Sequence, residues 1–255
     1  MLLDTPLVGA YSPPVDLAAK VARLNVQMRH HSAHDVLRAA VEAVPSLALV
    51  SSFGAESVAL LHVASQVKKD LSILFIDTQM LFAETLAYQR AVAIKLGLTR
   101  IRVIRAPDAA MHDPDGRLHQ RDTDACCHLR KTAPLQKALA GYDGWITGRK
   151  RFQSGTRAAL PHFEVEAPGG DIQPRIKVNP LAFWAAQDVT DYITENRLPR
   201  HPLVAQGYPS IGCAPCTSRV APGEDPRSGR WRDQPKDECG IHFVDGKMVR
   251  TGERP

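Results

Sequence analysis

Long hydrophobic segments are absent from this sequence. It contains no run of about 18 apolar residues, and its beginning, MLLDTPLVGAYSPPVD, lacks the basic region and long apolar stretch of a secretory signal. Internal repeats and low-complexity segments are absent too. We therefore expect a cytoplasmic protein with no membrane partner. Its 255 residues, 44% hydrophobic and 23% charged, suffice for one sizeable core with an appendage.

Cysteine is scarce, with five residues, an odd number. Because cytoplasmic thiols stay reduced, this count favours metal binding or catalysis over a disulfide framework. Aromatic residues make up 6% of the chain and form no evident platform for stacking nucleic-acid bases. A net charge of +5 and a pI near 9.0 nevertheless fit an anionic partner, either a nucleic acid or a small phosphorylated ligand.

Short apolar runs alternate with helix-like stretches along most of the chain. Residues 46–52 (SLALVSS) and 71–77 (LSILFID) have the composition of buried strands, and a helical pattern follows each. Later strand-like runs are RIRVIRAP, GWITG and PRIKVNPLAFW, and later helical ones are CCHLRKTAPLQKALAG and AAQDVTDYITENR. The alternation predicts an α/β fold, a parallel sheet flanked by helices.

Both ends of the chain depart from this pattern. The first 45 residues contain two amphipathic helical patterns, and from about Pro199 the alternation dissolves into segments rich in Pro, Gly and charge. We therefore divide the chain into N-terminal helices (1–45), a core domain (46–217) and a C-terminal tail (218–255). The tail is expected to be mobile until something holds it.

Two strand ends carry polar groups where an open parallel sheet binds ligands. In SSFGAES the chain turns through Gly54 into a helix whose free N–H groups can hold a phosphate or sulfate, with Ser51 and Ser52 as further donors. The segment lacks the Gly-Lys-Ser/Thr ending of a Walker loop, and a simple tight connection is the alternative. Asp77 and Thr78 end the next strand, where an Asp also serves as a helix cap.

A third strand end is followed by the basic segment GRKRFQSGTR. It places Arg149, Lys150, Arg151 and Arg157 within nine residues. A solvated charged loop is one interpretation. The position after the strand-like GWIT favours an anion site.

Four of the five cysteines form two close pairs. Cys126 and Cys127 begin a helical stretch, where the helix dipole favours thiolates that point towards one inorganic centre. Cys213 and Cys216 form a C-x-x-C turn, the usual half of a metal site. Four such thiolates suit Zn²⁺ or a 4Fe-4S cluster. The tandem pair is unusual for zinc and favours the cluster, with unrelated buried cysteines as the remaining alternative.

The fifth cysteine, Cys239, stands alone in the polar tail. Asp237 and Glu238 beside it raise the pKa of its thiol, so any activation has to come from elsewhere. His242 follows closely, and three arginines precede it. A free surface cysteine without a role is the alternative. No sixth cysteine remains to resolve an adduct on Cys239, so a covalent intermediate would need an external thiol.

Taken in order, the segments SSFGAES, IDTQ, CCHLRK, GRKRFQSGTR, CAPC, PRSGRW and ECGIH resemble those of the assimilatory adenylyl-sulfate reductases. These belong to the adenosine phosphosulfate and 3′-phosphoadenosine phosphosulfate reductase family. The resemblance runs from about Leu47 to Phe243 and leaves out the N-terminal helices. It implies a nucleotide α-hydrolase-like sheet that binds adenosine 5′-phosphosulfate, and a tail that carries the nucleophile.

The resemblance also implies roles for individual residues. Cys126, Cys127, Cys213 and Cys216 would ligate a 4Fe-4S cluster within the core domain, and Lys131 would lie between cluster and substrate. The nucleotide would meet Ser51, Ser52, Gly54, Asp77 and Thr78. Arg157, Arg227 and Arg230 would hold the phosphosulfate, and Arg149 is a further residue expected to bind the substrate. Cys239 would be the nucleophile, with His242 close by.

Three positions depart from the family pattern. Gln79 stands where a glycine is expected, which puts the backbone approach to the adenosine in doubt. Lys150 and Phe152 also differ from the residues typical of that loop.

The implied reaction is thioredoxin-dependent reduction of adenosine 5′-phosphosulfate to sulfite and AMP through a thiosulfonate on Cys239. Thioredoxin or a glutaredoxin-like dithiol protein is the expected partner, and we also expect a homo-oligomer that binds no nucleic acid. One alternative is a reductase of 3′-phosphoadenosine phosphosulfate, although relatives with that substrate lack the two cysteine pairs. A zinc-dependent nucleic-acid-binding module and an ATP pyrophosphatase are further alternatives, and neither needs Cys239.

Overall fold

The computed structural model describes residues 17–166, 173–232, 234 and 236, and the backbone of 243–244 and 247–248. The elements that enclose the sheet and form it are, in chain order, α1 (Leu17–Met28), α2 (Ala33–Ala43), β1 (Leu47–Ser51), α3 (Ser57–Val67), β2 (Ser72–Ile76), α4 (Ala83–Leu96), β3 (Ile101–Ile104), α5 (Ala109–His112), α6 (Leu118–Arg121), α7 (Thr123–Cys127), α8 (Ala133–Leu139), β4 (Gly144–Ile146), β5 (Phe163–Glu166), β6 (Arg175–Val178) and α9 (Ala186–Glu195). Two short strands, β7 (Phe243–Val244) and β8 (Lys247–Met248), pair with each other near the C-terminus.

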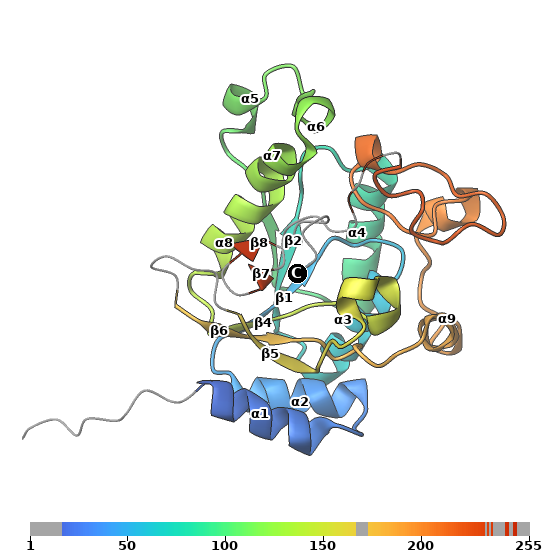
Figure 1. Ribbon diagram of the computed structural model, residues 1–255. Coiled ribbons are helices and arrows are strands. Elements are labelled where there is room, and N and C mark those ends of the chain that lie inside the picture. The colour runs from blue at the N-terminus through green and yellow to red at the C-terminus, as the bar shows by residue number, and fades with distance from the viewer. Residues whose placement is uncertain are drawn as a thin grey trace, which may run out of the picture.

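The six main strands form one sheet in the order β3-β2-β1-β4-β6-β5. Five run parallel, and β5 at the edge is antiparallel to β6. The predicted α/β class with a largely parallel sheet is therefore confirmed, and the antiparallel edge strand is an addition. Figure 1 shows the helices packed around this sheet.

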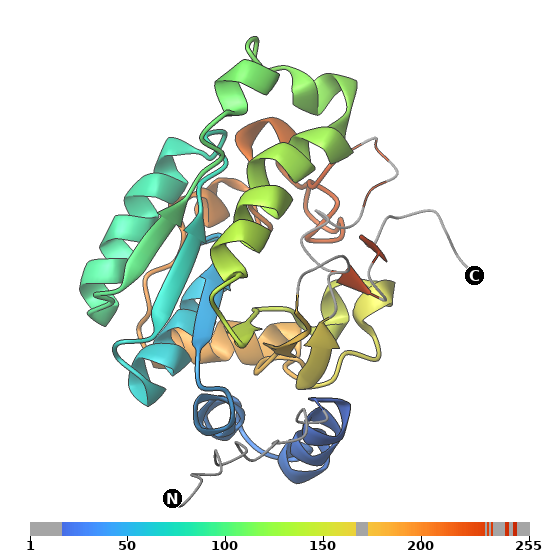
Figure 2. The same cartoon turned by 90° about the vertical axis from the view of Figure 1, so that its left-hand side faces the viewer.

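Successive residues of the central strands face different helix layers. Leu47 and Leu49 of β1 belong to the larger apolar core, with α1–α4 and α9, whereas Ala48 and Val50 belong to a smaller core. The smaller core includes Leu135 of α8. Because both faces are covered, β1 is buried along its whole length and is apolar up to its last residue, Ser51, as is typical of parallel strands. Figure 2 shows the α7–α8 layer and the α4 layer on opposite sides of the sheet.

The chain order of the strands fixes where a ligand can bind. From β1 the chain proceeds outwards through β2 to β3, and then returns to place β4 on the other side of β1. The loops after β1 and β4 therefore diverge at the carboxyl edge of the sheet. Such a topological switch point is where open α/β sheets bind ligands.

The predicted helix over CCHLRKTAPLQKALAG is interrupted by one wide turn. Between α7 and α8, His128–Thr132 form a π-helical turn in which Ala133 donates its backbone N–H to the His128 carbonyl. Pro134 in the first turn of α8 lacks an N–H, and its ring would clash with the carbonyl four residues back in a regular helix. The wide turn avoids this clash, and turns of this kind are frequent at functional sites.

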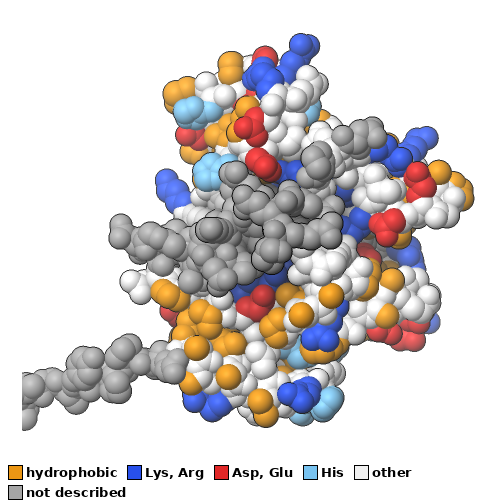
Figure 3. Space-filling model, viewed as in Figure 1, with side chains coloured by type: hydrophobic (Ala, Val, Ile, Leu, Met, Phe, Trp, Pro, Cys, Tyr) orange, Lys and Arg blue, Asp and Glu red, His pale blue; other side chains and the backbone are white. Residues whose placement is uncertain are grey.

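The N-terminal helices pack against the sheet that follows them. The Asn25 side chain of α1 donates to the Phe163 carbonyl (2.8 Å) and accepts from the Phe163 N–H (2.9 Å), so α1 occupies the open edge of β5. At the other end of the molecule, Figure 3 shows side chains of both charges over α5 and α6, where Arg121 pairs with Asp115. None of the helices within the described ranges has the length and apolar character needed to cross a membrane.

Candidate functional site

A cavity of about 250 Å³ lies at the switch point between β1 and β4. Seven of the nine residues predicted to bind the nucleotide line it: Ser51, Ser52, Gly54, Arg149, Arg157, Arg227 and Arg230. Asp77 and Thr78 do not. Thr78 lines a second, smaller pocket between the cysteines, and the Asp77 carboxylate pairs with Arg105 (2.8 Å).

The loop after β1 is shaped by two local features. Ser51 accepts a hydrogen bond from the Phe53 N–H (3.1 Å), and Phe53 has a left-handed backbone with φ of 50°. A Cβ on Gly54 would lie 3.1 Å from the Ile211 carbonyl oxygen. A side chain at position 54 would therefore push against the backbone of the segment before the C-x-x-C turn, which would have to shift slightly.

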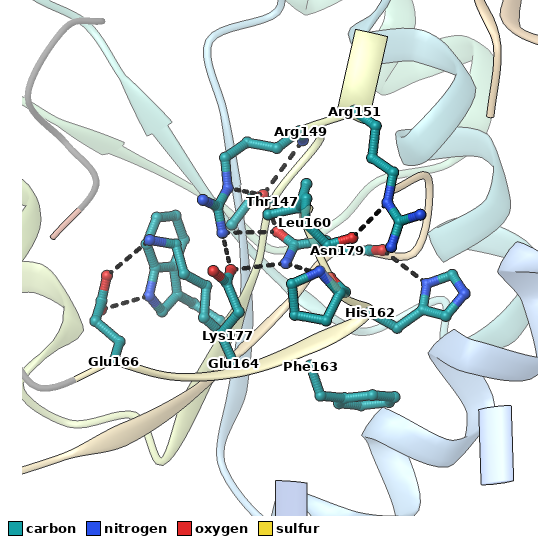
Figure 4. A network of polar contacts seen from close by, with 12 residues as sticks. Thr147, Arg149, Arg151, Leu160, His162, Phe163, Glu164, Glu166, Lys177 and Asn179 are labelled. Atoms are coloured by element: carbon teal, nitrogen blue, oxygen red, sulfur yellow. Dashed lines mark hydrogen bonds and ion pairs between the residues drawn. The ribbon is translucent and has the colours of Figure 1, made fainter. Parts of the chain in front are cut away.

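The side chains of the basic loop after β4 have different tasks. Arg149 is buried, forms an ion pair with Glu164 and donates to the Asn179 side chain (3.0 Å), as Figure 4 shows. Arg151 donates to the Leu160 carbonyl (2.8 Å) and stacks its guanidinium 3.7 Å from the Phe183 ring centre. Both cations thus stabilise the loop, and Arg149 does so while it lines the cavity.

A buried ion network lies behind Trp145, a residue of the cavity wall. Trp145 lines the cavity and donates its indole N–H to Glu166 (2.7 Å), which also accepts from Arg175 (2.7 Å) and Lys177 (3.1 Å). Burial lowers the pKa of Lys177 to about 8. No pattern in the sequence separated these residues from ordinary strand charges.

The segment after the C-x-x-C turn folds back onto the site. Thr217 and Arg230 form an antiparallel bridge, and the Trp231 N–H donates to the Cys216 carbonyl (3.1 Å). Without a side chain, Gly212 leaves room for the Arg230 guanidinium, which would lie 2.3 Å from a Cβ there. Arg227 and Arg230 thereby reach the same cavity as Arg157.

All four paired cysteines line one small pocket, together with Thr78, Arg130 and Lys131. The backbone brings the pairs together because Ala214 donates to the Met80 carbonyl (2.8 Å) and Leu81 bridges to Cys213. The Thr78 hydroxyl lies 3.2 Å from the Cys213 sulfur. Arg130 donates to the Thr78 carbonyl (3.2 Å) and pairs with buried Asp113 (2.8 Å). These two contacts anchor the π-helical turn, because Arg130 is one of its residues.

The thiols of this pocket influence one another's ionisation. Burial raises the pKa of Cys126 to about 11, and charge on Cys127 and Cys213 adds to the rise. Burial also acts against ionisation of Cys213, yet the Lys131 ammonium, the Thr78 hydroxyl and Arg230 outweigh it and lower the pKa of that thiol. Four thiolates here therefore need a positively charged centre.

Within the part of the chain that the structure describes, no group of three or more His, Cys, Asp or Glu side chains has the geometry of a metal site. Four thiolates are a donor set that structural zinc sites and 4Fe-4S clusters both use. The chemistry of these four side chains therefore fits either centre.

The nucleotide cavity and the cysteine pocket are adjacent. Arg230 lines the cavity, and its charge helps to lower the pKa of Cys213 and opposes the rise that burial causes in the pKa of Cys216. Lys131 lines the cysteine pocket, with its ammonium 4.0 Å from the Cys127 sulfur. Cys239 and His242 lie outside the described residues, so their predicted roles stay predictions.

Comparison with known proteins gives a consistent result. Residues 46–219 match the model of the phosphoadenosine phosphosulfate reductase domain. The chain is 46% identical over 231 residues to the adenosine 5′-phosphosulfate reductase of Mesorhizobium japonicum, and the match covers 89% of each protein. It is 42% identical over 241 residues to the adenosine 5′-phosphosulfate reductase of a Chelativorans species, and that match covers 92% of this chain and 96% of the relative. Among solved structures, it resembles the phosphoadenylyl-sulfate reductase of Candida auris in complex with phosphate, with a TM-score of 0.68 and 31% identity over 83% of this chain and 100% of that one.

Proposed function

The chain belongs to the phosphoadenosine phosphosulfate reductase family, and on this premise we propose that it reduces adenosine 5′-phosphosulfate to sulfite and AMP. The observation that carries the proposal is the pairing of two adjacent sites. A cavity lined by four arginines lies at the switch point, and a four-cysteine pocket adjoins it through Arg230. The names of the relatives at 42% and 46% identity support the substrate without a 3′-phosphate.

The four thiols fit a 4Fe-4S cluster by their number and chemistry and by their place around one pocket. Cys126, Cys127, Cys213 and Cys216 would hold it, and their negative charge would be balanced by the iron and by Lys131. When bound, the cluster would supply a structural link between the two cysteine pairs and a fixed charge near the substrate. Electrons for the reaction would come from thiols.

The reaction proceeds in two displacements. Arg157, Arg227 and Arg230 would neutralise the phosphosulfate and stabilise the charge that develops on the leaving phosphate. The Cys239 thiolate attacks the sulfur, the bond from sulfur to the bridging oxygen breaks, and AMP leaves with that electron pair. The enzyme keeps a thiosulfonate, Cys–S–SO₃⁻.

The second displacement requires an external dithiol of the thioredoxin or glutaredoxin class. One of its thiolates attacks the Cys239 sulfur, sulfite leaves, and the second thiol closes a disulfide that releases Cys239 as a thiol. The dithiol supplies both electrons, and sulfur(VI) becomes sulfur(IV). A reducing compartment such as the cytoplasm would maintain this donor.

Sulfite release tests the proposal. Anaerobically purified enzyme with thioredoxin is expected to release sulfite from adenosine 5′-phosphosulfate and to be much slower with the 3′-phosphorylated nucleotide. The variant Cys239→Ser is expected to be inactive with its iron content unchanged. Faster turnover of the 3′-phosphorylated substrate would reassign the substrate, and zinc in place of iron with no sulfite from either would contradict the proposal.

A further inference from the structure

Lys150 is a buried cation in the wall of the nucleotide cavity. Its side chain is 3% exposed, and its ammonium lies 2.6 Å from Glu56 Oε2. Burial lowers the pKa of Lys150, the Glu56 carboxylate counteracts this, and Arg157 and Arg227 lower it further. A lysine at this depth is stable as a cation only with a close counter-ion, and Glu56 provides it.

Glu56 places a carboxylate in the wall of a cavity that is proposed to bind an anion. It precedes α3, lines the cavity and is 35% exposed. An unpaired carboxylate at this place would repel an incoming phosphate or sulfate. The ion pair with Lys150 cancels that charge.

The same carboxylate also controls the orientation of a neighbouring amide. Gln153 donates its side-chain N–H to Glu56 (3.4 Å), so its carbonyl end points the other way. That oxygen accepts from the Lys150 backbone N–H (3.1 Å) and from the Arg157 guanidinium. Because an amide has one donor end and one acceptor end, Glu56 determines that the acceptor faces Arg157.

We propose that Glu56, Lys150 and Gln153 are positioning residues that hold Arg157 towards the anion of the bound nucleotide. Lys150 acts on the ligand by neutralising Glu56 and does not contact it. The inference rests on the proposed function in that it takes an adenylate as the ligand. It also gives a role to Lys150, a position where this chain departs from the family pattern.

A double-substitution cycle separates this role from direct contact. Equilibrium dissociation constants of AMP and of adenosine are measured for wild type, Lys150→Met, Glu56→Gln and the double variant. Lys150→Met leaves the Glu56 charge without its counter-ion and is expected to weaken AMP binding about tenfold or more. In the double variant the affinity for AMP is expected to return to within about threefold of wild type. This corresponds to a coupling between Lys150 and Glu56 in the usual range for contacting residues. Adenosine carries no phosphate, so its affinity stays within about twofold throughout.

Two further variants sharpen the test. Gln153→Met leaves the ion pair intact and removes the acceptor of Arg157, so it is expected to weaken AMP binding and leave adenosine binding unchanged. Lys95→Met removes an exposed lysine of α4 and is the matched control, with both affinities unchanged.

The outcomes distinguish the possible failures. If the double variant binds AMP as weakly as Lys150→Met does, Lys150 contacts the ligand itself and the proposal is overturned. Equal loss of affinity for AMP and for adenosine would indicate structural damage and would also overturn it. If wild type binds AMP and releases sulfite but the cycle is additive, the inference fails and the proposed function stands. Wild-type protein that binds neither ligand and releases no sulfite contradicts both.

Discussion

Gln79 is held in a left-handed backbone conformation, with φ of 61°. Its N–H donates to the Asp77 carboxylate (2.9 Å), which fixes the turn after β2. This explains why glycine is typical of the family here: the turn needs a conformation that costs other residues about 1–2 kcal/mol. The left-handed geometry of this turn is therefore kept with a side chain present.

Replacement of Gln79 by glycine should stabilise the protein. We expect Gln79→Gly to raise the free energy of unfolding by about 0.5–1 kcal/mol, since relief of the left-handed strain exceeds the added entropy of the unfolded chain. Urea denaturation measures the change. Gln79→Ala is the control and should show no gain, and equal destabilisation by both variants would contradict the explanation.

We expect Lys131 to influence the rate of the reaction and not the assembly of the cluster. Its ammonium approaches the Cys127 sulfur (4.0 Å) and lowers the pKa of Cys213, yet it is not itself a ligand. We expect Lys131→Met to lower kcat/KM by about 10- to 100-fold because a cation near developing charge is lost. Iron content, measured in parallel, should be unchanged, and loss of iron in the variant would assign Lys131 a structural role.

At the scale of elements, His201 fastens the segment leading to the second cysteine pair onto α4. Its Nδ1 accepts from the Leu203 N–H (3.2 Å), so Nε2 carries the proton and faces the Thr85 hydroxyl (3.0 Å). Burial lowers the pKa of His201 to about 4, although Glu84 acts in the opposite direction. Protonation of Nδ1 would break the bond to Leu203.

This arrangement predicts a loss of stability in mild acid. Because the folded pKa is below the usual 6.5, the stabilisation is complete above about pH 6.5 and is lost as the pH falls towards 4. Between pH 7 and pH 5 we expect a loss of about 2 kcal/mol. His201→Asn keeps an acceptor but cannot gain the proton, so its unfolding free energy should fall less over this range, and an equal fall would contradict the assignment.

The sequence indicates the parallel strands well and the edge strand poorly. The predicted runs at 46–52 and 71–77 contain β1 (47–51) and β2 (72–76), because strands buried on both faces need continuous apolar residues. The segment FEVE of β5 carries two glutamates, and its edge is completed by Asn25, a residue 138 positions away. Pairing across that distance leaves no local pattern.

At the scale of the whole molecule, the cysteine pocket joins three distant parts of the chain. The turn after β2, the α7 helix and the C-x-x-C turn all contribute to it. A group that binds only the folded arrangement stabilises it. We expect iron-loaded protein to melt roughly 5–10 °C above iron-free protein, and this difference should vanish in Cys213→Ala. An unchanged melting temperature would contradict a structural role for the cluster.

The candidate site was predictable where a local pattern marks it. Cysteine spacing indicated the shared pocket, and strand ends indicated the cavity around Ser51, Gly54 and Arg157. The same patterns could not show that Arg149, which lines the cavity, is also paired with Glu164, nor that Thr78 lies in the cysteine pocket. These assignments depend on tertiary contacts between strands that are distant in sequence.

The proposed reaction requires a covalent intermediate on Cys239, and the intact mass of the protein tests this requirement directly. Anaerobic enzyme incubated with adenosine 5′-phosphosulfate and no thiol should gain the mass of one sulfonate group, and thioredoxin should remove it as sulfite. Cys239→Ser should gain nothing. A protein that releases AMP while its mass stays unchanged, or a sulfonate adduct that persists in Cys239→Ser, would contradict the account.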